Sequence, residues 1–348
     1  AHGCRKAADI AAPRPTLQDV AARSGFALRT VKKVMSGDLS VRDKNREAIL
    51  GAAEDLHYVP NRAASALGRR SHIRIAVVYA RFTDLYFSDM ERGFQRAQAE
   101  LFDYGLTLEY VDTVLDDPQP QREALQALLS RSDIDGVVLN PRSQDQLDDR
   151  IDALMAAGKP VAVCGTDAPG SRRLFYTSCD PERAGRIAGQ LLCWEMGGRG
   201  RAAVFCSPGH DQINKRTDGF AAYVQTRCPQ IRIDLISEHG PEGCRRAVNR
   251  LLDEGQINGI FCAAAPALYV GQVLKERRIP DFPMVGFDYS APTAQLLRER
   301  YISALLDERP DKYAYLAVKK LFQYLTDGAI PAPVEFTPSY ILTSESIL

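Results

Sequence analysis

The sequence predicts an all-α head that contains a helix-turn-helix, followed by an α/β body of two doubly wound parallel-sheet lobes. The 348 residues exceed the usual size of a single domain. Residues 1–73 contain 13 Lys+Arg against 7 Asp+Glu, a net charge of +6, whereas the remainder carries −6. Beyond residue 73, apolar runs alternate with amphipathic stretches. A basic head on an acidic body is typical of a polyanion-binding module fused to another domain.

Composition limits the class of protein. The 45% hydrophobic and 25% charged residues are ordinary for a globular chain and exclude a wholly disordered or fibrous one. No run of 18 apolar residues is present, so we expect no membrane span. The start, AHGCRKAADIAAPRP, lacks the apolar core of a secretion signal. We therefore expect a cytoplasmic protein whose residues 1–14 form a disordered tail.

The eight cysteines are predicted to be reduced core thiols. They form no CxxC pair, and no histidine lies at zinc-finger spacing. Several end apolar runs such as AVFC and GIFC, where a thiol acts as a small hydrophobe. We expect no metal site and no cofactor.

The first and third helices of the head have recognisable starts. Thr16 followed by Asp19 is a capping box, and Ser24-Gly25 ends the first helix. Ser40 with Asp43 is predicted to cap the third helix in the same way. The residues expected to complete the core from that third helix are Ile49, Leu50, Ala53 and Leu56.

The second helix has one apolar and one basic face. Its inward residues are predicted to be Val31, Val34 and Met35. Its outward residues are predicted to be Leu28, Arg29, Lys32 and Lys33. Two short helices joined by a tight glycine turn, the second with a basic outer face, make a helix-turn-helix. The alternative is a small helical bundle with a solvated charged face.

The segment after the head argues against that alternative. Pro60 ends the preceding structure, Asn61 is a good N-cap, and the turn that follows is rich in alanine. Such small side chains cannot bury a core of their own, so this helix needs an external surface to fold against.

The stretches DVAARSG, TVKKVMSG and VPNRAASAL resemble the LacI/GalR family of bacterial transcription regulators, and the resemblance covers essentially the whole chain. It implies a helix-turn-helix domain over 15–59, a hinge helix and linker over 60–73, and an effector-binding and dimerisation domain over 74–348. In that family the second helix lies in the major groove of an operator. The hinge helices of a dimer each wedge a leucine into the minor groove.

The resemblance also implies which residues contact DNA. Leu28, Arg29 and Lys33 would read base edges, Thr30 and Lys32 would lie near phosphates, and Leu67 would be the wedge. The full implied set is Thr16, Leu28, Arg29, Thr30, Lys32, Lys33, Asn61, Arg62, Ala64 and Leu67. The chain departs from the family pattern at Ala27, Lys32 and Ser36. Lys32 replaces a serine, which should raise non-specific affinity and its salt dependence.

The body is predicted from its alternating pattern. Buried strands are expected at 73–80, 106–111, 134–140, 160–165, 201–207, 231–237, 257–264 and 282–288. Helices are expected between most of them, including 88–103, 121–130, 181–196 and 243–253. This alternation indicates parallel sheets covered by helices on both faces. Ligands in such folds bind at the carboxyl ends of strands, in the crevice between lobes.

Enzyme chemistry is the competing interpretation of the body. No G-x-G-x-x-G follows the first strand, no Walker loop is present, and the five histidines are scattered. His210 and Asp211 in SPGHDQINKR suggest acid–base chemistry, although a polar pocket loop explains them equally well. We therefore expect no enzyme.

The body resembles the periplasmic sugar-binding-protein fold that LacI/GalR regulators carry as an effector domain. The resemblance rests on stretches such as CDPERAGRIAG, KRTDGF and VGFD. It implies that the chain crosses between lobes near residues 173, 302 and 332. The lobe boundaries that follow are about 74–172 with 303–331, and about 173–302 with 332–348.

Several pocket positions of that family are retained. Arg216 matches the arginine that grips the effector, and Asp288 matches an acidic residue that pairs with sugar hydroxyls. Tyr86 and Phe87 would cover the sugar ring, unless they pack in the core. Arg216 could instead pair with Asp218 at the surface. The implied set is Asp84, Tyr86, Phe87, Arg216, Asp288 and Glu308.

Other pocket positions have changed. Gly165 stands where the family has aspartate, although Thr166 or Asp167 could reach in. Ala264-Ala265 replaces Asn-Asp, and Glu308 replaces a glutamine. These changes remove hydroxyl partners of a free hexose or pentose. The two retained charges of opposite sign would also suit a sugar acid.

Together these features predict a dimeric DNA-binding transcription regulator, a repressor, controlled by a small polar metabolite such as a sugar or sugar acid. A two-fold dimer implies a pseudo-palindromic operator. The alternative is a solute-binding transport component with a basic N-terminal extension.

Overall fold

The computed structural model divides the chain into two compact units, a head up to Ser71 and a body from His72. The division lies within the predicted linker. For residues 80 and 84–87 only the backbone is described. The described residues are 15–35, 41–56, 58, 72–80, 84–113, 117–142, 145–206 and 211–347. The predicted tail and nearly all of the predicted hinge and linker therefore lie outside them.

The head is a three-helix unit of α1 (Leu17–Ser24), α2 (Leu28–Met35) and α3 (Asp43–Asp55). The predicted capping box is present, with Thr16 and Asp19 each bonding the other's backbone N–H. Gly25 ends α1 at a φ of 74°, a left-handed conformation that favours glycine. Val20, Val31 and Ile49 are fully buried and supply one core residue from each helix.

Two details of α3 differ from the prediction. Its N-cap is Arg42, which makes no side-chain cap bond, and the predicted cap at Ser40 lies outside the described residues. Leu50 is 46% exposed, whereas Ala52 is buried. Because successive residues turn by about 100° around a helix, Ile49 facing inward carries Leu50 outward and brings Ala52 to the core.

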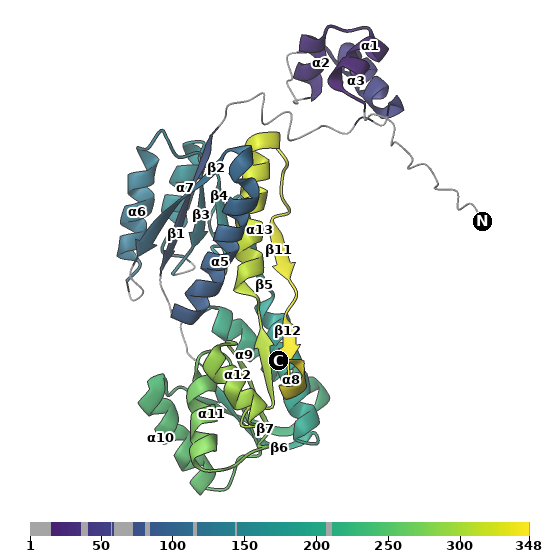
Figure 1. The fold of residues 1–348 in the computed structure, drawn as a ribbon. Coiled ribbons are helices and arrows are strands. Elements are labelled where there is room, and N and C mark those ends of the chain that lie inside the picture. Colours follow the sequence, from purple (N-terminus) through teal and green to yellow (C-terminus); the bar gives the residue numbers. More distant parts are fainter. Residues whose placement is uncertain are drawn as a thin grey trace, which may run out of the picture. The chain divides into compact units, whose positions relative to one another are not determined.

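Lobe 1 of the body is built on a six-stranded parallel sheet of order β11-β5-β4-β3-β1-β2. Helices α5 and α13 pack on one face, and α6 and α7 on the other (Figure 1). The strands are β1 (Ile73–Ala80), β2 (Leu106–Thr113), β3 (Gly136–Asn140), β4 (Val161–Cys164), β5 (Phe175–Cys179) and β11 (Val334–Thr337). The helices are α5 (Asp84–Leu101), α6 (Gln119–Leu129), α7 (Asp148–Ala156) and α13 (Pro310–Asp327), with a short 3-10 turn η1 (Phe102–Tyr104).

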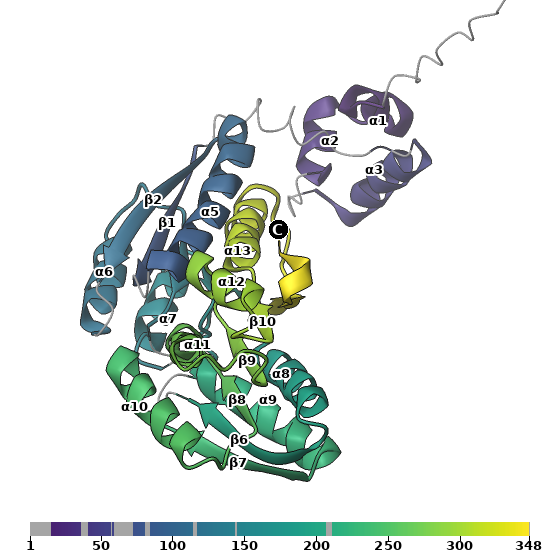
Figure 2. The same ribbon diagram turned by 60° about the horizontal axis from the view of Figure 1, so that its bottom comes forward.

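Lobe 2 is built on a second six-stranded sheet of order β12-β10-β9-β8-β6-β7, in which only the β10–β12 pair is antiparallel. Helices α8 and α9 cover one face, and α10 to α12 the other (Figure 2). The strands are β6 (Arg199–Phe205), β7 (Gln230–Ile236), β8 (Gly259–Cys262), β9 (Met284–Phe287), β10 (Ala304–Asp307) and β12 (Tyr340–Leu342). The helices are α8 (Pro181–Glu195), α9 (Asp211–Arg227), α10 (Gly240–Asp253), α11 (Pro266–Glu276) and α12 (Ala291–Arg298), with the 3-10 turn η2 (Ser344–Ser346).

The fold class is thus confirmed, but the three lobe crossings lie later in the chain than expected. β5 and β11 belong to the sheet of lobe 1, and β10 belongs to lobe 2. The crossings therefore follow residues 179, 307 and 337 rather than 173, 302 and 332. Residues 171–173, where the resemblance implied the first crossing, lie in a loop within lobe 1 that leads into the buried strand β5.

Seven cysteines lie in the described part of the chain, and none of them is in a disulfide. Six are buried, and burial raises the pKa of Cys244 to about 11, so this thiol stays protonated at neutral pH. Cys4 lies outside the described residues. Across the described ranges, no helix is both long and apolar enough to cross a membrane, and no three His, Cys, Asp or Glu side chains are grouped to hold a metal ion.

Candidate nucleic-acid interface and effector site

The outer face of α2 is basic, as predicted. Arg29, Lys32 and Lys33 are exposed, whereas Val31 and Val34 are buried against α1 and α3. Leu28 and Thr30 are half-buried beside this face. The short helix thereby presents a row of cations on a fixed scaffold, which is the arrangement needed to meet phosphates and guanine edges in a major groove.

Thr16, a predicted DNA contact, is also the N-cap of α1. Its hydroxyl donates to Oδ2 of Asp19 over 2.7 Å and accepts from the N–H of Asp19 over 3.3 Å. The bond from the Thr16 hydroxyl, together with a bond from the Thr16 N–H to the same oxygen over 2.6 Å, holds the pKa of the Asp19 carboxyl below its usual value. Thr16 therefore remains a predicted DNA contact only from its exposed position at the start of α1. The predicted contacts Asn61, Arg62, Ala64 and Leu67 lie outside the described residues.

In the body, the structure brings Arg216 and Glu308 together in a buried ion pair. Nη2 of Arg216 lies 2.5 Å from Oε2 of Glu308, and the two residues are 5% and 8% exposed. Nη1 of Arg216 donates to the carbonyl of Ala263 over 2.8 Å. The guanidinium carbon lies 4.3 Å from the centre of the Phe287 ring, a cation–π contact. The alternative that Arg216 pairs with Asp218 at the surface is therefore wrong.

Two glycines allow α9, the helix that carries Arg216, to pack closely against α8. A methyl group at Gly185 of α8 would collide with the carbonyl of Arg216, and one at Gly219 of α9 would collide with the carbonyl of Glu182. Only glycine allows this close approach of α8 and α9. The glycines in RAGRIAG and KRTDGF therefore determine how closely α9 packs on α8. This packing sets how deeply Arg216 lies in lobe 2.

Three residues of the predicted set, Arg216, Asp288 and Glu308, meet at the carboxyl edge of the second sheet. Asp288 directly follows β9 and Glu308 directly follows β10, while the Ala263 carbonyl follows β8. Burial raises the pKa of Asp288 and of Glu308, and the nearby Arg216 opposes this rise in both. Two carboxyl groups thus share one guanidinium, at the edge where ligands bind in this architecture.

The aromatic residues and Asp84 come from lobe 1. Helix α5 begins at Asp84, four residues before the predicted start, so Tyr86 and Phe87 lie in its first turn, shortly after β1. This places their backbone at the carboxyl edge of the first sheet. The side chains of Asp84, Tyr86 and Phe87 lie outside the described part, so their roles stay predictions.

Asp167 forms an ion pair with Arg173. Nε and Nη2 of Arg173 lie 2.5 and 2.9 Å from the two carboxylate oxygens of Asp167, and both side chains are largely buried. Nη1 of Arg173 also donates to the carbonyl of Pro333, at the start of β11. The suggestion that Asp167 reaches into the pocket therefore stays a prediction, and its carboxylate is engaged by Arg173.

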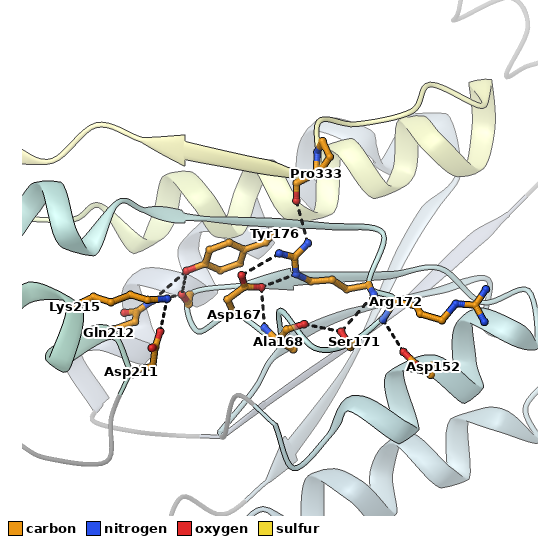
Figure 3. Close-up of polar contacts among 12 residues, drawn as sticks. Asp152, Asp167, Ala168, Ser171, Arg172, Tyr176, Asp211, Gln212, Lys215 and Pro333 are labelled. Carbon is orange, nitrogen blue, oxygen red and sulfur yellow. Dashed lines mark hydrogen bonds and ion pairs between the residues drawn. The ribbon is translucent and has the colours of Figure 1, made fainter.

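A contact between the lobes was missed by sequence reasoning. Gln212, in the first turn of α9, donates through Nε2 to the carbonyl of Gly165 in lobe 1, and lies 3.3 Å from Oγ of Ser178 and 3.4 Å from Oη of Tyr176 (Figure 3). The hydroxyl of Tyr176 donates to the same carbonyl over 2.6 Å. The start of α9 therefore faces lobe 1, and its only sequence signal was a polar residue in the loop after a strand.

The loop that suggested acid–base chemistry has another explanation. Oδ2 of Asp211 forms an ion pair with Nζ of Lys215, 2.7 Å away and one turn along α9 (Figure 3). His210 lies outside the described residues. Asp211 is thus accounted for as part of the first turn of α9.

Comparison with known families agrees with this division of the chain. Residues 16–61 match the bacterial regulatory proteins of the lacI family. Residues 75–329 match the periplasmic binding protein domain. The chain is 25% identical to the sucrose operon repressor of Pediococcus pentosaceus, over 93% of this chain and 96% of that protein. It is also 25% identical to the catabolite control protein A of Staphylococcus aureus, over 54% of this chain and 55% of that protein.

Solved structures show the same fold. A sugar-binding protein of a sugar ABC transporter from Bacillus halodurans superposes with a TM-score of 0.71 at 23% identity, covering 78% of this chain and 98% of that one. A glucose-galactose binding protein from Geobacillus stearothermophilus gives a TM-score of 0.70 at 23% identity, covering 80% and 99%. These likenesses establish the architecture of the body.

Proposed function

Since the chain belongs to the lacI family of bacterial regulatory proteins and carries a periplasmic binding protein domain, we propose that it is a repressor controlled by a metabolite bound between lobes 1 and 2. The family is one of DNA-binding transcription regulators. The observation that carries the proposal is the basic outer face of α2, where Arg29, Lys32 and Lys33 are exposed on a capped three-helix head. We place its action in the bacterial cytoplasm, where operators are found.

The metabolite is a small polar molecule of the sugar class. One relative is named a sucrose operon repressor, and one neighbour in fold is a glucose-galactose binding protein. Arg216 and Asp288 provide a fork of donors and a pair of acceptors beside it. Tyr86 and Phe87, at the carboxyl edge of the first sheet, would supply an aromatic cover from lobe 1.

Control of DNA binding follows from closure of the lobes. A ligand held by residues of both lobes favours a closed arrangement of lobes that already touch where Gln212 contacts Gly165. In a homodimer, closure changes the separation of the two heads and the formation of the hinge helices. The ligand thus shifts the population between states that bind and do not bind a pseudo-palindromic operator.

Selection of genomic DNA fragments by the full-length protein over a salt series tests this function. We expect a specific fragment to bind at least about a thousandfold more tightly than random duplex. Leu67→Ala, which removes the implied wedge, should weaken that preference while leaving non-specific binding intact. If no fragment is preferred over random duplex, the regulator function fails and a solute-binding transport component becomes the better explanation.

A further inference from the structure

The cluster of buried Arg216 and Glu308 with half-buried Asp288 has an excess of negative groups, with two carboxyls for one guanidinium. We propose that this site, taken as the effector site of the function proposed above, selects an uncharged or cationic polyhydroxyl ligand that donates hydrogen bonds, and excludes sugar acids. The proposal rests on that function and adds the charge class of the ligand.

Both Nη groups of the arginine already have acceptors within the site. Its Nη1 donates to the carbonyl of Ala263 and its Nη2 to Glu308, and one face of the guanidinium lies on the Phe287 ring. A ligand carboxylate that binds both Nη groups competes with Glu308 for Nη2. It would then leave the Glu308 carboxylate buried without its counter-charge, which is strongly unfavourable.

Glu308 in contrast has an acceptor to offer. The residue is 8% exposed, and its Oε1 is a buried oxygen with no hydrogen-bond partner, while Oε2 is held by Arg216. A buried acceptor without a donor is costly, so a ligand that supplies one gains the full value of the bond. Hydroxyl and ammonium groups supply a donor, whereas a carboxylate at neutral pH supplies only acceptors.

Asp288 adds a second acceptor at the same edge. It adopts a left-handed φ of 67° after β9, and its carbonyl accepts from Oγ1 of Thr293 over 3.0 Å, which holds the turn. Its charge disfavours ionisation of Glu308, so the two carboxyls are close enough to interact. A third carboxylate brought by a ligand would meet like charge from both.

Titratable side chains from lobe 1 and from the segments that cross between the lobes do not offset the excess of carboxyl groups. The thiol of Cys179 interacts electrostatically with Glu308 and Arg216. Burial raises its pKa to about 12, so the thiol is neutral. Arg309 is paired with Asp311, with both carboxylate oxygens at 2.9 Å. Among the described side chains around the cluster, Arg216 is therefore the cation on which an acid would depend.

Binding of matched sugar series by calorimetry tests the proposal. The probes are D-glucose, D-glucosamine and D-glucuronate, with the same three derivatives of galactose and mannose. Each is titrated into the full-length wild-type protein, into Glu308→Gln and into Glu254→Gln. Glu308→Gln keeps the shape of the side chain and removes its charge. Glu254→Gln makes the same change at an exposed position, the C-cap of α10.

We expect the neutral or amino member of a binding series to bind at least about tenfold more tightly than its acid, because like charges across a site are costly. Glu308→Gln should lower this ratio of the affinity for the neutral or amino sugar to the affinity for its acid. Glu254→Gln should leave the ratio unchanged. An acid that binds as tightly as its neutral partner, or a ratio unchanged in Glu308→Gln, overturns the charge selection and leaves the effector site standing. Failure of all nine probes to bind any of the three proteins contradicts the effector site itself.

Discussion

Nη2 of Arg216 lies 2.5 Å from Oε2 of Glu308, although 92 residues separate them in the chain. The pair joins α9 to the segment after β10, at the point where the chain leaves lobe 2 for α13 of lobe 1. The same two side chains thus stabilise the body and form the floor of the proposed effector site.

Removal of the arginine should destabilise the body strongly. Arg216→Met leaves Glu308 and Asp288 buried without their counter-charge, and we expect a loss of about 3–5 kcal/mol in the free energy of unfolding. The single tryptophan, Trp194, lies on α8 of the body and reports unfolding in urea by its fluorescence.

The double variant is the control for that experiment. Arg216→Met with Glu308→Leu removes both partners and should recover most of the stability, because the buried charge of Glu308 is gone. A double variant that is as unstable as Arg216→Met would mean that the arginine acts through packing on Phe287 rather than through the ion pair.

Substitution of Glu308 and substitution of Glu109 should change the pH dependence of the free energy of unfolding in opposite directions. Burial raises the pKa of Glu308, so the native state holds its proton at a pH where the unfolded chain has lost it. Its contribution to stability is present at low pH and is lost as the pH rises from the unfolded value through the folded one. Relative to wild type, Glu308→Gln should therefore gain stability as the pH rises above about 4.5.

Glu109 provides the opposite case. A hydrogen bond from Arg131 lowers its pKa, so its contribution is present above the unfolded value and is lost as the pH falls through the folded one. Relative to wild type, Glu109→Gln should lose stability as the pH rises toward about 4.5, below the range in which Glu308→Gln gains it. Urea unfolding at a series of pH values measures both, and parallel curves for the two variants would refute the account.

The contact of Gln212 with lobe 1 should protect the loop that it touches. Gln212→Ala removes the donor to Gly165, and with one hydrogen bond worth about 1 kcal/mol the amides near Gly165 should exchange roughly fivefold faster. Hydrogen–deuterium exchange measures this directly. Asn214→Ala changes an exposed neighbour on α9 and should leave the exchange unchanged, so equal effects of both variants would exclude a contact-specific role.

Lys32 should contribute to DNA affinity through phosphate rather than through sequence. We expect Lys32→Ala to weaken binding to all duplexes alike and to reduce the slope of log K against log salt by about 0.9. Fluorescence anisotropy over a salt series measures the slope. Lys275→Ala removes the same charge from α11 of the body and should leave it unchanged. A loss confined to one sequence would instead assign Lys32 to base recognition.

Local patterns predicted most of the elements of this fold. The eight apolar runs expected as strands are strands, and the head helices begin and end near the expected residues, because alternation and capping are written in neighbouring positions. β5 was missed because five residues, Phe175–Cys179, follow a polar turn with no periodicity of their own. Its place in lobe 1 depends on pairing with β4 and β11, which lie elsewhere in the chain.

The site was predicted less completely, because its pairings are long-range. The resemblance identified Arg216, Asp288 and Glu308, but the sequence offered the nearby Asp218 as the partner of Arg216. The sequence likewise left Asp167 as a candidate for the pocket, and only the fold shows that it pairs with Arg173. Which carboxylate a cation selects is decided by strand order and helix packing.

The most direct test of ligand control is operator binding with and without the ligand that binds the body. Once calorimetry has identified that ligand, anisotropy titrations of the selected operator fragment are made with wild type and Arg216→Lys. We expect saturating ligand to change the operator affinity of the wild type at least about fivefold, and that of the variant much less at the same concentration. An operator affinity that is unchanged while the ligand is bound would contradict the account.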